Sequence, residues 1–193
     1  MKNTFKAIVG LLAVCAASSV FAAAPAKENK SGEDIYIGAS GGVIFPMKAD
    51  GLKYKTGGSG SLFVGTKYED FRFELEGTYK DSQVKEINGE SCDFDYRHLA
   101  GLINAYYDLS IQENLDWYFG LGCGWSNVKL KNNVGDGEDK ADVFAYQFMT
   151  GVTYHCTTNI ALFGGYKLFH TTKANSTKMP WIHGVEVGLR YTF

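Results

Sequence analysis

Ionisable and apolar side chains alternate over residues 71–80, and this stretch is the strongest candidate for chemistry in the chain. Successive residues of a β-strand point to opposite faces, so its charged members share one face and its aromatic and aliphatic members the other. Four charged residues on one strand face are unusual for a soluble core. Together with similar positions near the C-terminus, the charged candidates are Arg72, Glu74, Glu76, Lys80, Lys167, Glu186 and Arg190.

Other spacings in the sequence match catalytic or binding motifs poorly. Gly120, Gly122 and Gly124 lack the helix and the third-glycine spacing of a phosphate loop. Residues 136–142 are acidic but lack the ordered oxygen ligands of a calcium loop. The histidines show no paired metal-binding spacing, and no serine lies in a nucleophile motif, although a Ser-His-carboxylate set assembled across strands stays open. We expect no enzymatic activity, cofactor or metal.

The N-terminal residues predict export. Lys2 and Lys6 precede an apolar run at residues 7–16, and small residues follow to a cleavage site after Ala22. This pattern is typical of a signal peptide, here residues 1–22, followed by a short polar tail at residues 23–33. Cys15 raises the alternative of a lipid anchor, but the valine before it and the cleavage site downstream argue against that reading.

Eight stretches with period-two alternation follow, and they predict an all-β, eight-stranded antiparallel up-and-down transmembrane β-barrel over residues 34–193. The expected strands are residues 34–46, 59–68, 71–80, 93–109, 115–129, 141–154, 160–169 and 183–193. The expected long connections are residues 46–58, 81–92, 130–140 and 170–181, and the short ones are residues 69–70, 110–114 and 156–159. Long and short connections that alternate are the outer-membrane barrel pattern. No window after residue 23 is apolar for long enough to be a transmembrane helix.

Two barrels share this alternation, and they differ in which face points outward. A soluble lipocalin-like barrel would enclose a ligand with its apolar face. A membrane barrel would turn that face to lipid, where Arg or Lys at mid-depth costs about 2–4 kcal/mol. The export signal and the glycines and serines of the polar face favour the membrane barrel. Its lumen is then expected to be plugged by ion pairs, because isolated buried charges are very costly. The expected interfacial aromatics are Tyr107, Trp117, Tyr154 and Trp181.

Three motifs and the C-terminal residue carry a family resemblance: RFELEGTYK from Arg72, NAYYDL from Asn104, YFGLGCG from Tyr118, and the terminal Phe193. In order and spacing they resemble the opacity-type and outer-membrane-protein-A-like barrels of Gram-negative bacteria. The resemblance implies a cell-outer-membrane protein whose assembly signal is an alternating apolar C-terminal strand, matched here by Leu189, Tyr191 and Phe193. It also implies contact with the barrel-assembly machinery.

Members of that family are surface antigens, adhesins or structural barrels, so several functions stay open. The first is an adhesin or surface antigen whose loops contact a host or extracellular ligand, and the others are a structural barrel for envelope integrity and a narrow pore. Outer-membrane lipid is an expected partner, whereas the net charge of −2 gives no indication of nucleic-acid binding. Cys92, Cys123 and Cys156 are an odd set, so no disulfide framework is predicted.

Overall fold

The computed structural model describes residues 34–47, 52–87, 90–132, 138–172 and 179–193. The predicted signal peptide and tail lie outside these residues. These residues form nine strands. They are β1 (Asp34–Pro46), β2 (Leu52–Tyr54), β3 (Gly57–Tyr68), β4 (Phe71–Ile87), β5 (Glu90–Gln112), β6 (Leu115–Asn132), β7 (Glu138–His155), β8 (Ile160–Thr171) and β9 (Ile182–Thr192).

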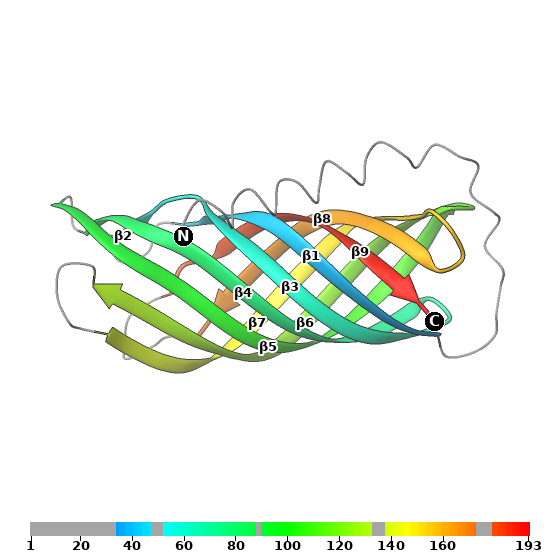
Figure 1. Cartoon of the computed structure of the whole chain (residues 1–193), viewed down its shortest axis with the longest axis horizontal. Coiled ribbons are helices and arrows are strands. Elements are labelled where there is room, and N and C mark those ends of the chain that lie inside the picture. Colours follow the sequence, from blue (N-terminus) through cyan, green and yellow to red (C-terminus); the bar gives the residue numbers. More distant parts are fainter. Residues whose placement is uncertain (1–33, 48–51, 88–89, 133–137, 173–178) are drawn as a thin grey trace.

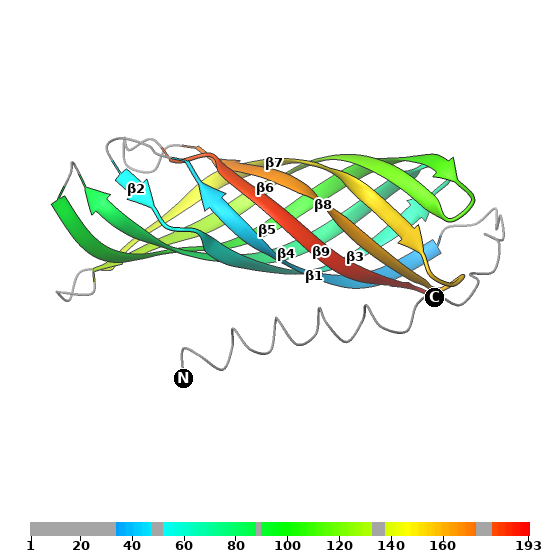
Figure 2. The ribbon, with the colours of Figure 1, turned by 90° about the horizontal axis from the view of Figure 1, so that it is seen from above.

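Eight of these strands close into a barrel, which confirms the predicted fold class. Their order is β4-β3-β1-β9-β8-β7-β6-β5, and β5 returns to pair with β4, so the main ring has no free edge. Every pairing in the ring is antiparallel, and the strands wind around one long axis (Figures 1 and 2). The short β2 lies outside the ring and pairs only with β4. Within the described residues, no helix has the length and apolarity needed to cross a membrane.

The two ends of the barrel differ. The connections β3–β4, β5–β6 and β7–β8 are short, and they lie at the same end as the C-terminus, on the right in Figure 1. The tightest is the turn Glu69–Asp70, in which Glu69 has a φ of 53°, a left-handed conformation that is uncommon for a residue with a side chain. Sequence alternation predicted this arrangement of short connections correctly.

The strands at the opposite end run further than alternation predicted, which corrects two of the expected long loops. The β4–β5 ladder continues to the pair Ile87 and Glu90, and the β6–β7 ladder continues to Lys131 and Glu138. The segments expected as loops 81–92 and 130–140 are therefore mostly strand. Alternation of apolar residues is required only where the strands face lipid. Beyond that region a hairpin is stabilised by backbone pairing and needs no apolar face, so the sequence pattern does not mark it as strand.

The two faces of the barrel have opposite chemistry. Arg72, Glu76, Lys80 and Asn104 are at most 2% exposed and point inward, whereas Leu62, Ile103 and other large apolar side chains of the outer wall are more than 60% exposed. A water-soluble barrel would have the reverse arrangement, because burying charged groups is costly and exposing a large apolar surface to water is unfavourable. The outer wall therefore has the chemistry of a surface in contact with lipid.

Candidate functional site

Strand β4 supplies the centre of a charged lumen. Its even-numbered residues Arg72, Glu74, Glu76 and Lys80 all point inward and are buried. Its odd-numbered residues, such as Phe73, form the exposed wall. Because the alternation of a single strand fixes both sets, β4 cannot be shifted by one residue without exposing charge to the outside.

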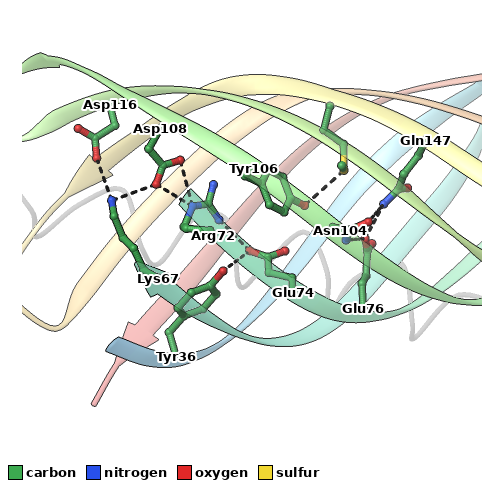
Figure 3. A network of polar contacts seen from close by, with 11 residues as sticks. Tyr36, Lys67, Arg72, Glu74, Glu76, Asn104, Tyr106, Asp108, Asp116 and Gln147 are labelled. Carbon is green, nitrogen blue, oxygen red and sulfur yellow. Dashed lines mark hydrogen bonds and ion pairs between the residues drawn. The ribbon is translucent and has the colours of Figure 1, made fainter. Parts of the chain in front are cut away.

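The first group of lumenal contacts, the Arg72 cluster, joins β4 to β1 and β5 (Figure 3). Arg72 donates from Nε to Asp108 Oδ2 at 2.8 Å and from Nη1 to Glu74 Oε1 at 2.8 Å. The Tyr36 hydroxyl donates to the same Glu74 oxygen at 2.9 Å. The Arg72 guanidinium also lies 4.4 Å from the centroid of the Tyr106 ring, a cation–π contact.

The Arg72 cluster continues toward the end with the short turns. Lys67 Nζ lies 3.0 Å from Asp108 Oδ2 and 4.0 Å from Asp116 Oδ2. Asp116 also binds His155 Nε2 at 2.8 Å and accepts a hydrogen bond from the Ser110 hydroxyl at 2.8 Å. Because Ser110 donates to the carboxylate and not to the imidazole, this Ser-His-Asp set lacks the contact that activates a serine nucleophile.

The second group, the Glu76 cluster, spans the lumen from β4 to β7, β8 and β9. Lys167 Nζ lies 2.9 Å from Glu76 Oε1 and 3.1 Å from Glu186 Oε2. Asn104 and Gln147 donate to Glu76 Oε2 at 2.8 Å and 2.7 Å. Since β4 is not a ladder neighbour of β7 or β8, these contacts connect opposite walls through the interior.

Two lumenal cations contact aromatic rings instead of carboxylates. Lys80 Nζ lies 4.0 Å from the centroid of the Phe169 ring and donates to the Thr78 hydroxyl at 3.1 Å. The Arg190 guanidinium lies 5.0 Å from the Tyr36 ring and 5.8 Å from the Phe163 ring. Among the described residues, neither cation forms an ion pair.

Lumenal glycines give these long side chains room. A Cβ on Gly120 would lie 2.4 Å from the Tyr106 ring, and one on Gly122 would lie 1.9 Å from Asn104 Oδ1. Small residues on one wall therefore face bulky or hydrogen-bonding side chains on the next. The space that remains between the clusters is a cavity of about 20 Å³.

The outer wall carries the candidate interfacial aromatics. Tyr107 packs against Phe71 and Trp117 stacks on Phe119, with centroids 5.3 Å and 5.7 Å apart, at the end with the short turns. Tyr154, beside that end, is also exposed. Trp117 Nε1 donates at 2.9 Å to Thr150, a polar residue of the wall.

Trp181 lies at the other end of the barrel. It stacks on His170 with ring centroids 4.3 Å apart and meets Tyr146 edge-on. Sequence reasoning missed a second aromatic pair there, Trp125 and Phe144, whose centroids lie 6.0 Å apart. Both residues lie on the outward face of their strands. Their position beside the polar pair Asn127 and Asp142 could have identified them in the sequence as aromatics at the membrane interface.

The structure brings all seven predicted charged residues into one lumen, but it adds partners that the sequence analysis did not assign to the network. These are Tyr36, Lys67, Asn104, Asp108, Asp116, Gln147 and His155. Asn104, Asp108 and Gln147 share the inward parity of their strands, and that parity was the signal that could have found them. Of the predicted assembly-signal residues, Leu189, Tyr191 and Phe193 are all exposed on the outer wall, and the Tyr191 and Phe193 rings touch.

The described residues contain no group of three or more His, Cys, Asp or Glu side chains placed to hold a metal. Cys123 is an exposed free thiol on the wall, and Cys156 is a partly buried free thiol at the β7–β8 turn. The side chain of Cys92 lies outside the described residues. The ion pairs and hydrogen bonds of the lumen therefore serve to connect opposite walls of the barrel.

Comparison with solved structures finds similar barrels. Neisserial surface protein A is 21% identical, with a TM-score of 0.67, over 84% of this chain and 99% of that chain. The outer membrane protein OprG from Pseudomonas aeruginosa is 15% identical, with a TM-score of 0.53, over 86% and 99%. Ail, the attachment invasion locus protein of Yersinia pestis, is 17% identical, with a TM-score of 0.50, over 83% and 97%. At these identities the likeness shows the fold alone.

A search of curated protein sequences gave no significant match. The profile of the family described as outer membrane protein beta-barrel domain, in contrast, matches residues 12–193. That match covers the whole barrel, and the apolar wall around a charged lumen is the arrangement such a barrel needs in lipid. The chain therefore belongs to the outer membrane protein β-barrel domain family, whose members lie in the bacterial outer membrane.

Proposed function

We propose that this chain is a surface protein whose sealed barrel holds two long hairpins outside the membrane for adhesion or recognition. The observation that carries the proposal is the length of β4 to β7. The outer wall turns polar at the ion pair Asp81–Arg97, with Nε and Oδ1 3.5 Å apart, yet β4 continues to Ile87. The parts of β4 to β7 beyond the apolar wall are not needed to span the membrane, but they can present binding surfaces on a rigid scaffold.

The relatives give this proposal a direction. One similar structure is that of a surface protein, and another is that of an attachment invasion locus protein in complex with the heparin analogue sucrose octasulfate. By analogy we infer that a host or extracellular ligand contacts the hairpins of this chain. The analogy rests on the shared fold, which does not by itself imply a shared ligand.

Register partners define a clean test. Joining Gln83 to Asp95 and Lys129 to Lys140 through Asn-Gly turns removes both hairpin tips and keeps every remaining pair of the β4–β5 and β6–β7 ladders in register. The strand β2 and the end of β5 lose only the partners that lie on the removed tips. We expect cells carrying this double variant to lose adhesion while their folded barrel shows the same heat-modifiable mobility on a gel. The matched control replaces the turn Glu69–Asp70 at the other end with Asn-Gly. Unchanged adhesion of the double variant would refute the proposal.

A structural barrel for envelope integrity is the alternative. The cross-lumen ties of the Glu76 cluster favour it, because they brace opposite walls. A deletion strain that leaks periplasmic protein but adheres normally would select this function. The same cluster argues against a pore, and we expect no large, steady conductance from the purified protein in planar bilayers.

We further infer that residues 1–22 direct export and that β9 is read by the barrel-assembly machinery. Support for the second inference comes from the apolar outer face of β9 and from the exposed Phe193 that directly follows it. Detection of a mature N-terminus at residue 23 by mass spectrometry would test the first inference. The second is tested by the Phe193 variant described in the Discussion.

A further inference from the structure

Unpaired hydrogen-bonding atoms of both kinds surround the lumenal cavity between the Arg72 and Glu76 clusters. The unpaired donor is Arg190, a residue that is 5% exposed and whose buried Nε has no hydrogen-bond acceptor among the described residues. Among the described residues, the guanidinium instead makes cation–π contacts with the rings of Tyr36 and Phe163. A buried cation held only by aromatic faces leaves several N–H donors without a partner, which is costly.

The unpaired acceptors are one oxygen on each of two carboxylates. Glu74 receives both its hydrogen bonds on Oε1, from Tyr36 and Arg72. Glu186 receives both of its contacts on Oε2, from Ser40 and Lys167. Among the described residues, Glu74 Oε2 and Glu186 Oε1 therefore have no donor.

Arg190, Glu74 and Glu186 line the same cavity, and its volume of about 20 Å³ suits one water molecule. A cavity holds water when it offers roughly 10–15 Å³ or more together with two to four polar partners. A water molecule accepts from Arg190 and donates to both carboxylates, which satisfies all three groups at once. An anion would satisfy Arg190 but would face two carboxylates across the same small space.

From this geometry we propose that the lumen contains a specific hydration site in which one long-lived water bridges Arg190 to Glu74 and Glu186. The bridge makes Arg190 part of the network and joins the Arg72 cluster to the Glu76 cluster. A second lumenal cavity, beside Lys80 and Phe169, measures only about 10 Å³ and lies at the lower limit for water. We therefore place the bridging water at Arg190.

Nuclear magnetic resonance of the complete chain refolded in nanodiscs tests this site. The chain has only three arginines, Arg72, Arg97 and Arg190, so labelling arginine with ¹⁵N gives three Nε–H signals. We expect the Arg190 signal to show a cross-peak with long-lived water. Arg72 is the internal control, because its Nε–H donates to Asp108 at 2.8 Å and should show no such cross-peak.

Each outcome decides the matter. An Arg190 signal that is visible but lacks a water cross-peak would refute the site, and so would equal cross-peaks at Arg72 and Arg190. Exchange of Arg190 Nε–H with bulk water fast enough to erase its signal would also refute it, because the cavity would then be open. A crystal structure with ordered density between Arg190 and the two carboxylates would give independent support.

Discussion

At the scale of single residues, Glu76 is the side chain on which most lumenal contacts converge. It binds Lys167, Asn104 and Gln147 at once. Glu76→Ala should destabilise the barrel by about 3 kcal/mol, because Lys167 keeps only Glu186 as an ion-pair partner and the buried Asn104 amide loses its acceptor. Urea titration of the barrel refolded in vesicles, followed by tryptophan fluorescence, measures the change in free energy of unfolding.

Lys80→Met is the matched control for this prediction. Lys80 is equally buried and lies on the same strand, but it forms no ion pair among the described residues. Its replacement removes a desolvated charge and leaves no orphaned partner, so we expect a neutral or stabilising effect. Equal losses from both substitutions would mean that stability depends on lumen filling and not on ion pairing.

Sequence alternation could place the charged residues of β4 on the inward face, but it could not name their partners. Glu76 meets Lys167 across the lumen, and which height of β8 faces which height of β4 depends on the stagger of all the strands between them. That stagger is a property of the closed ring and leaves no local trace in the sequence. Tyr36 was missed for the same reason, since an aromatic on an apolar-looking strand gives no sign that its hydroxyl reaches Glu74.

At the scale of elements, the β3–β4 turn stores strain that a single substitution can remove. Glu69 adopts a φ of 53°, which costs a residue with a side chain about 1 kcal/mol relative to glycine. Glu69→Gly should therefore raise the free energy of unfolding by about 1 kcal/mol. Asp70→Gly is the control, because Asp70 does not share this conformation and glycine there adds only chain entropy. The urea midpoints of the two variants should move in opposite directions.

The predicted assembly role of β9 can be separated from simple packing. Phe193 and Phe71 are both exposed on the outer wall near the same end, at 69% and 50%. Phe193→Ala should lower the amount of folded protein in cell envelopes while refolding in vitro stays nearly unchanged, because the purified chain needs no assembly machinery. Phe71→Ala removes the same ring from another strand. If it lowers envelope levels equally, the signal does not reside in β9.

At the scale of the whole molecule, the depth of the barrel in the membrane can be read from its own cysteines. In variants that keep one cysteine each, Cys123 on the wall should resist a charged maleimide in vesicles, because a charged reagent does not enter the hydrocarbon core. Cys156 at the β7–β8 turn should react when the reagent reaches that side. Rapid labelling of Cys123 in intact vesicles would contradict the placement of the wall in lipid.

The pairing of β1 with β9 has a consequence for how the protein reaches this state. These strands are the first and last of the ring, and they are joined by register pairs from Tyr36–Thr192 to Pro46–Ile182. Translation cannot complete the ring piece by piece, because β1 waits for a partner synthesised about 140 residues later. Until then the apolar side chains of the outer face have no closed wall to belong to, and a chain truncated before β9 can form only an open sheet with β1 and β8 as free edges.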